Sequence, residues 1–192
     1  MKFLLIDTTA DKLLTATKNG GKIVYEFGNG DKGSTSLSII PTIQKVLSRS
    51  GFEINEIDCV FAVVGPGSFT GIRIGVCTAQ SIAFGVDRPA CSLTVFDGFG
   101  YDGLCVIPSR RGYCYYSQNG QFGEKSIEEI EQEKDLRYRL FDLSVGKAVS
   151  DEDYIANLFM VAEKKYNDKN FIPLEPMYLK QSQAERMRKE NK

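Results

Sequence analysis

The eight residues IDCVFAVV, at 57–64, constrain the fold more than any other part of this chain. They form an almost unbroken apolar run, which is the pattern of a β-strand buried on both faces. A glycine loop, GPGSFTG at 65–71, follows directly and leads into a helix expected at about 71–85. A buried strand between helices, preceded by shorter strands, is typical of an α/β layer arrangement.

Three short strands are expected ahead of this run, at 3–7, 12–17 and 22–27. The NGG turn at 19–21, between the last two of them, is a strong hairpin signal. A helix then begins near Ser34 or Ser36, either of which could cap it, and its apolar residues fall in one stripe. Pro41 lies inside this helix and should kink it or shift its start.

A domain boundary is expected near residues 95–102. It divides the chain into an N-terminal lobe, 1–98, and a shorter C-terminal lobe with a tail, 99–192. The second part is expected to hold two short strands, at 103–107 and 113–117, and then an acidic stretch on a solvated helix face at 124–135. A helix is expected at 151–166, followed by an extended segment at 173–180 and a solvated helix or frayed tail at 181–192.

The composition excludes several kinds of function. The chain has 24 basic and 25 acidic side chains, so it has no overall electrostatic footprint for nucleic acid, and any RNA contact is local or shared with a partner. It has no histidine, which excludes HExxH metal sites, Ser/His/Asp and Cys/His triads and imidazole acid–base catalysis. Chemistry based on paired carboxylates is left open.

A cytoplasmic protein is expected. The apolar run at the start of the chain is too short for a signal peptide, and no run approaches the roughly 18 apolar residues of a membrane helix. The five cysteines are odd in number and form no CxxC pair. They are therefore expected to be reduced, partly buried thiols.

The glycine loop has two interpretations. Its motif consists of Gly65, Pro66, Gly67, Ser68, Phe69 and Thr70. Free N–H groups and the positive end of the helix dipole would suit a phosphate. Alternatively, the loop is a tight turn in which glycines supply positive φ and Thr70 caps the helix. The string matches neither the P-loop nor the GxGxxG fingerprint.

The helix after the loop carries a ridge with almost no side chain. Gly71, Gly75, Ala79 and Ala83 recur at spacings of four. Glycine in a helix lowers stability by roughly 1 kcal/mol relative to alanine, so the presence of two glycines indicates that close packing requires them. The ridge either packs against the helix at 36–50 within the chain, or both helices present a surface to another protein.

Four segments together resemble the TsaB family, also called YeaZ. They are LLIDTT (4–9), STSLSIIPTIQKVLSRSG (34–51), GPGSFTGIRIG (65–75) and LEPMYLK (174–180). The resemblance is strong over about 1–95 and at 174–180, and thin between them. It implies a two-lobed fold of the actin/Hsp70/sugar-kinase (ASKHA) type with a reduced C-terminal lobe. The family is the accessory subunit of the bacterial machinery that makes threonylcarbamoyladenosine at position 37 of tRNAs reading ANN codons.

The resemblance also implies partners. A larger paralogue, TsaD, carries the catalytic metal on a His-x-x-x-His motif and transfers the threonylcarbamoyl group from its adenylate. A chain without histidine cannot be that paralogue, so no enzyme activity, cofactor, or catalytic, cofactor-binding or metal-binding residue is expected here. The ATPase TsaE is a further implied partner. The chain would meet tRNA only within the complex, and no membrane.

In this family the helices that correspond to 36–50 and 71–85 pack against those of TsaD, or of a second copy in a homodimer, as a four-helix bundle. The implied interface residues are Leu37, Ile40, Gln44, Gly71, Arg73, Gly75, Ala79 and Ala83. On this interpretation Gly75→Leu, or leucine at Ala79, abolishes the complex and leaves the monomer folded.

Two places bear on nucleotide binding. Asp7 ends the first strand where sugar kinases and actin relatives begin their first phosphate loop, but the glycine usual in those loops is missing, which favours a structural turn. Many relatives open the second lobe with Asp-Ala-Arg-x-Gly, whereas this chain has PSRRG at 108–112 and lacks the carboxylate.

Three hypotheses about function follow. The resemblance favours a non-catalytic scaffold that activates TsaD. An ATP-dependent kinase-like enzyme of the same fold is the alternative, and it predicts tight nucleotide binding by the isolated chain. A peptidase is the third, and without histidine its metal site would need carboxylates and thiols alone.

Overall fold

The computed structural model describes residues 1–28 and 35–179 and contains two compact units. The first unit comprises Met1–Gly100 together with Ser150–Pro176, and the second is built on Tyr101–Val149. The sequence-based division placed all of 99–192 in the second lobe. The structure differs because the helix after Ser150 buries its apolar side against the first unit.

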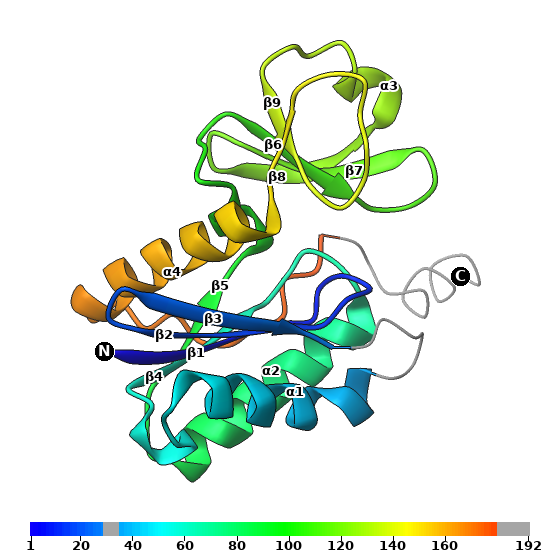
Figure 1. Cartoon of the computed structure of the whole chain (residues 1–192). Coiled ribbons are helices and arrows are strands. Elements are labelled where there is room, and N and C mark those ends of the chain that lie inside the picture. Colours follow the sequence, from blue (N-terminus) through cyan, green and yellow to red (C-terminus); the bar gives the residue numbers. More distant parts are fainter. Residues whose placement is uncertain (29–34, 180–192) are drawn as a thin grey trace. The chain divides into compact units, whose positions relative to one another are not determined.

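The first unit has a five-stranded sheet in the order β3-β2-β1-β4-β5 (Figure 1). Its strands are β1 (Lys2–Asp7), β2 (Leu14–Asn19), β3 (Lys22–Phe27), β4 (Cys59–Val63) and β5 (Ala90–Leu93). The first three are antiparallel, whereas β4 and β5 run parallel to β1. A two-residue turn at 20–21 joins β2 to β3, so the predicted hairpin is confirmed.

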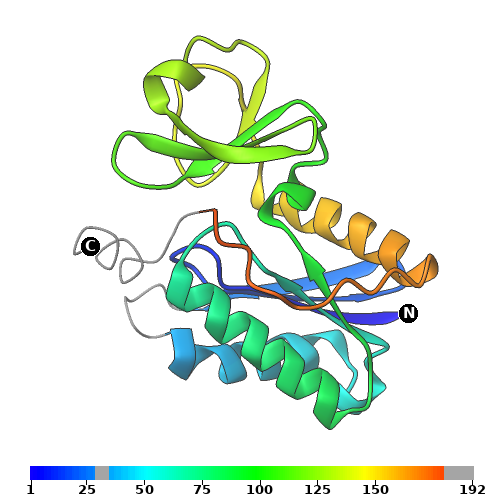
Figure 2. The ribbon, with the colours of Figure 1, turned by 180° about the vertical axis from the view of Figure 1, so that it is seen from behind.

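Helices cover both faces of this sheet. α1 (Thr35–Ser50) and α2 (Phe69–Gly85) lie on one face and α4 (Asp151–Asn167) on the other, as Figures 1 and 2 show from opposite sides. Two short 3-10 turns, Ile54–Glu56 and Val95–Phe99, complete the unit. Every residue of β4 is buried, as the apolar run at 57–64 predicted.

Successive side chains of β1 point to opposite faces of the sheet, so the residues of β1 contact the helices of the two faces in alternation. Phe3 lies on the α4 face, where its ring centroid is 5.1 Å from that of Tyr166. Asp7 also contacts α4, whereas Thr8 contacts α2. The end of β1 is therefore the place where helices from both layers of the first unit meet the same short segment.

The starts of α1 and α2 test two predictions made from the sequence. α2 begins at Phe69 and its cap is Ser68, whose hydroxyl accepts a hydrogen bond from the Gly71 N–H at 3.2 Å, so the prediction of Thr70 as cap is wrong. Ser68 is the last residue with extended ψ before the helix, which is the geometry of a cap. α1 begins at Thr35, between the two predicted caps, so Pro41 lies inside the helix without shifting its start, and its side chain is exposed.

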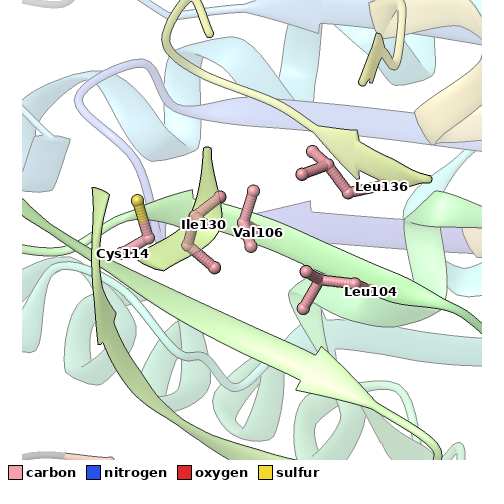
Figure 3. Packing of buried hydrophobic residues seen from close by; sticks show 5 residues of the cluster. All are labelled: Leu104, Val106, Cys114, Ile130 and Leu136. Carbon is pink, nitrogen blue, oxygen red and sulfur yellow. The ribbon is translucent and has the colours of Figure 1, made fainter. Parts of the chain in front are cut away.

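The second unit has its own sheet, in the order β10-β9-β6-β7-β8. Its elements are β6 (Leu104–Pro108), β7 (Tyr113–Gln118), β8 (Gln121–Ser126), α3 (Ile127–Ile130), β9 (Leu136–Tyr138) and β10 (Lys147–Ala148). Figure 3 shows its buried cluster, which consists of Leu104, Val106, Cys114, Ile130 and Leu136. The acidic stretch at 124–135 was expected on one helix, but it divides between β8, the four-residue α3 and a turn, because Ser126 caps α3 after the strand.

The predicted tail at 181–192 lies outside the described residues. Within the described part of the chain, no helix combines the length and the apolar character that a membrane crossing requires.

Candidate partner-binding face

The glycine loop is held against the end of β1. The Ser68 N–H donates to the Thr9 carbonyl at 2.7 Å. A Cβ at Gly67 would lie 2.3 Å from that same oxygen, so only glycine permits this approach. Gly65, at φ 127°, has a backbone conformation that side chains disfavour. Since the Ser68 hydroxyl also caps α2, the loop has the contacts of a tight strand-to-helix turn.

Asp7 is buried and its carboxylate is occupied by donors from the protein itself. One oxygen, Oδ1, accepts hydrogen bonds from the Thr9 N–H at 2.9 Å and the Thr9 hydroxyl at 2.6 Å. The other, Oδ2, accepts one from the Tyr154 hydroxyl of α4 at 2.8 Å. These contacts fit the structural turn expected for this segment.

The small-residue ridge of α2 packs inside the chain. Gly71, Gly75, Ala79 and Ala83 are all buried. A Cβ on Gly71 would lie 2.0 Å from the Thr8 carbonyl oxygen, and one on Gly75 would lie 2.2 Å from the Thr8 hydroxyl oxygen. The ridge therefore brings α2 close to the end of β1. All four expected interface residues on this ridge are therefore buried within the first unit, and the neighbour of Gly71 and Gly75 is Thr8, not a residue of the helix at 36–50.

The other four expected interface residues, Leu37, Ile40, Gln44 and Arg73, are exposed. On α1, Leu37, Ile40, Gln44 and Ser48 recur at the helical spacing of one face. Leu37 is 80% exposed and Ile40 is 48% exposed. Large apolar side chains at such exposure, repeated along one helix face, are typical of a surface that another molecule covers.

α2 carries a matching outward stripe. Arg73, Cys77, Ser81 and Phe84 are all exposed and follow the same helical spacing. Phe84 is 91% exposed, and the Arg73 guanidinium lies 4.0 Å from the centroid of the Phe69 ring. We call these two stripes the α1/α2 face, defined by Leu37, Ile40, Gln44, Ser48, Arg73, Cys77, Ser81 and Phe84.

A groove of about 610 Å³ adjoins the α1/α2 face where the two helices approach the 3-10 turn at Ile54–Glu56. Its wall from α1 includes Ile40 and Leu47, and Ile82 contributes from α2. Two carboxylates, Glu53 and Glu56, also line it, and that of Glu56 is paired with the Lys2 ammonium group. The groove therefore has both apolar and acidic lining residues.

Sequence reasoning missed four members of this face, namely Ser48 and Ser81 and the two less polar residues Cys77 and Phe84. The stripe of Arg73 could have been extended by steps of three and four to Cys77 and Phe84, and Phe84 is a large apolar residue between Ala83 and Gly85 near the end of a helix. The groove could not have been found this way, because residues from three separate elements form it.

A carboxylate does lie near the PSRRG turn of the second unit, but it comes from another strand. Glu124 of β8 accepts hydrogen bonds from the Ser109 hydroxyl at 2.6 Å and from Arg110 Nη2 at 3.3 Å. Across residues 1–28 and 35–179, no group of three or more histidine, cysteine, aspartate or glutamate side chains is placed to hold a metal ion.

The cysteines differ sharply in accessibility, which gives a direct test of the α1/α2 face. Cys77 is exposed, whereas the other four are buried. Burial disfavours the thiolate and raises the pKa of Cys59 and Cys105 to about 12 and that of Cys114 to about 11; it also raises the pKa of Cys91.

At pH 8, maleimide should therefore label the native chain once, at Cys77, and the unfolded chain five times. Because the thiolate is the nucleophile, the raised pKa of the four buried cysteines slows their reaction further. Peptide mapping by mass spectrometry checks the site. Equal labelling of a second cysteine in the native chain would contradict this placement of α2.

Comparisons with known proteins find relatives among proteins of tRNA threonylcarbamoyladenosine biosynthesis. The model of the TsaD family, tRNA N6-adenosine threonylcarbamoyltransferase, matches residues 34–105. The chain is 27% identical over 158 residues to the tRNA threonylcarbamoyladenosine biosynthesis protein TsaB of Escherichia coli, a match that covers 75% of this chain and 68% of that protein. It is 43% identical over 94 residues to TsaB of Haemophilus influenzae, covering 49% of this chain and 39% of that protein.

The fold is shared with a solved structure of YeaZ from Pseudomonas aeruginosa. The two superpose with a TM-score of 0.69 at 18% identity, over 93% of this chain and 99% of that one. Together with the TsaD-type match, this likeness confirms the expected α/β fold of the actin/Hsp70/sugar-kinase class.

Proposed function

The chain belongs to the TsaB (YeaZ) family, and on that premise we propose that it is a non-catalytic accessory subunit of tRNA threonylcarbamoyladenosine biosynthesis. In this role it binds a TsaD-type transferase and supports the transfer of the threonylcarbamoyl group to adenosine 37. The site of action is the cytoplasm. The alternative is a kinase-like enzyme of the same fold.

The observation that carries the proposal is the α1/α2 face. Both helices lie inside the segment, 34–105, that matches the transferase family. A transferase that is related over this segment has an equivalent helix pair, and two related helix pairs can pack about a pseudo-twofold axis as in a symmetric dimer. Exposed Leu37, Ile40 and Phe84 supply the apolar contact area for such packing.

A second copy of this chain would use the same face, so the homodimer competes with the transferase complex. Binding of the transferase then depends on the concentration of the chain itself. The ATPase TsaE and tRNA join only once the transferase is bound, which agrees with a chain that has nearly balanced charge.

The proposed mechanism is a coupling between partner binding and catalytic competence. If the transferase has active and inactive arrangements, a subunit that binds the active one more tightly shifts the population towards it. The accessory chain needs no reacting group for this role. The occupied carboxylate of Asp7 supports this view over the kinase-like alternative, because a nucleotide there would displace donors from Thr9 and Tyr154.

The function is tested by depleting the protein in its host and measuring threonylcarbamoyladenosine in digested total tRNA by mass spectrometry. The nucleoside should fall to background and return when the wild-type chain is restored. An unchanged level with the transferase present would contradict the pathway assignment. Tight binding of ATP by the isolated chain would favour the kinase-like alternative.

A further inference from the structure

A chain of hydrogen bonds within the first unit links α4 to the first turn of α2. The Tyr154 hydroxyl of α4 donates to Asp7 Oδ2 at 2.8 Å. The other oxygen of Asp7 fixes the following turn through the Thr9 N–H and hydroxyl, at 2.9 and 2.6 Å. The Thr9 carbonyl then accepts the Ser68 N–H at 2.7 Å. Ser68 is the cap of α2, so the link ends where that helix begins.

A second contact joins the same turn to α2. The Thr8 hydroxyl donates to the Gly71 carbonyl at 2.7 Å. The approach is so close that no Cβ fits at Gly67, Gly71 or Gly75 without displacing Thr8 or Thr9. A shift of the turn at 7–9 must therefore move the start of α2 with it, because the packing leaves no slack to absorb the change.

The link is buried from α4 to the turn at 7–9, whereas Ser68 at its far end is exposed. Asp7 is 6% exposed and Tyr154 is 1% exposed. The site is nearly closed to bulk solvent, so removing the Tyr154 hydroxyl takes a donor from a buried carboxylate oxygen. Losing one hydrogen bond to a buried charged group changes an equilibrium by roughly tenfold or more.

We propose that Tyr154 and Asp7 are positioning residues for the α1/α2 face. They fix the turn at 7–9, and that turn fixes the first turns of α2, from which Arg73 and Cys77 project. α4 lies on the opposite side of the sheet from α2, so the link transmits the position of one helix layer to the other. The effect on partner affinity rests on the proposed function, whereas the effect on α2 does not.

Tyr154→Phe tests the proposal, because it keeps the ring that fills the space beside Gly98 and removes only the hydroxyl. Hydrogen exchange of the backbone amides at 68–72 should speed up by roughly tenfold. Affinity for the TsaD-type transferase should fall by a similar factor, through loss of preorganisation.

Asn157→Ala is the matched control. It removes another side-chain hydrogen bond from α4, from Asn157 Nδ2 to the Gly98 carbonyl at 3.1 Å, and does not touch Asp7. Exchange should rise in α4 and stay unchanged at 68–72. Equal acceleration at 68–72 in both variants, or in neither, would overturn the proposal. If the wild-type chain fails to bind the transferase, the proposed function fails, and the exchange data still decide this inference.

Discussion

Gly75→Leu is expected to destabilise the first unit and not merely to block a partner. A Cβ at this position would lie 2.2 Å from the Thr8 hydroxyl oxygen, and three more carbons would follow into a fully packed region. Overpacking of this kind costs about 3 kcal/mol or more. For a chain of this size, that lowers the melting temperature by at least about 6 °C. Thermal unfolding followed by circular dichroism measures the effect.

Gly85→Leu provides the matched control, since Gly85 also lies in α2 but a Cβ there meets nothing within 4 Å. Its melting temperature should stay close to that of the wild type, because most surface substitutions change stability by less than about 0.5 kcal/mol. If the two variants had the same melting temperature, the close packing of α2 on β1 would be wrong. The ridge would then be free for a partner.

The double variant Ile40→Asp with Phe84→Asp is expected to abolish binding of the TsaD-type transferase while the monomer stays folded. The two side chains are 48% and 91% exposed, so the folded chain gains little from them. Buried at an interface, each would act as an apolar anchor, and placing a carboxylate there costs about 2 kcal/mol or more. Affinity should fall by roughly a hundredfold or more, as measured by calorimetry.

Met160→Asp controls for a charge placed on any exposed apolar side chain. Met160 is 58% exposed on α4, which covers the other face of the same sheet. Its affinity for the transferase should equal that of the wild type. Loss of binding in this variant, or full binding by the Ile40/Phe84 double variant, would move the docking surface away from α1 and α2.

Local patterns predicted most elements of the first unit. The apolar run at 57–64 indicates a buried strand, and the NGG turn indicates a tight hairpin. The apolar stripe of α1 indicates an amphipathic helix. These signals lie within a few residues of one another. They can therefore be interpreted without knowledge of the rest of the fold.

The direction of the α2 ridge could not be predicted in this way. Glycines and alanines that recur every four residues predict a close neighbour for the helix. The pattern does not say whether that neighbour belongs to the same chain or to another protein. Thr8 decides the matter, and it lies 63 residues from Gly71 in the sequence. The interface role expected for Leu37 and Ile40 on α1 stays a prediction, and the structure adds only that both side chains are exposed.

The Asp7 site shows the same limit. Its partner Tyr154 lies 147 residues away, on a helix that returns to the first unit after the whole of the second. The missing glycine after Asp7 favours a structural turn, but nothing nearby in the sequence identifies the tyrosine that occupies its carboxylate. Only the packing of α4 against the sheet brings the two together.

The most direct test of the central claim is a reconstituted reaction with purified transferase, TsaE-type ATPase, tRNA and the threonylcarbamoyl adenylate, in which threonylcarbamoyladenosine is measured by mass spectrometry. The nucleoside should form when the wild-type chain or Met160→Asp is added, and should stay at background with the Ile40→Asp/Phe84→Asp variant or with no addition. Equal formation in the absence of this chain would contradict its role as the subunit that makes the transferase active.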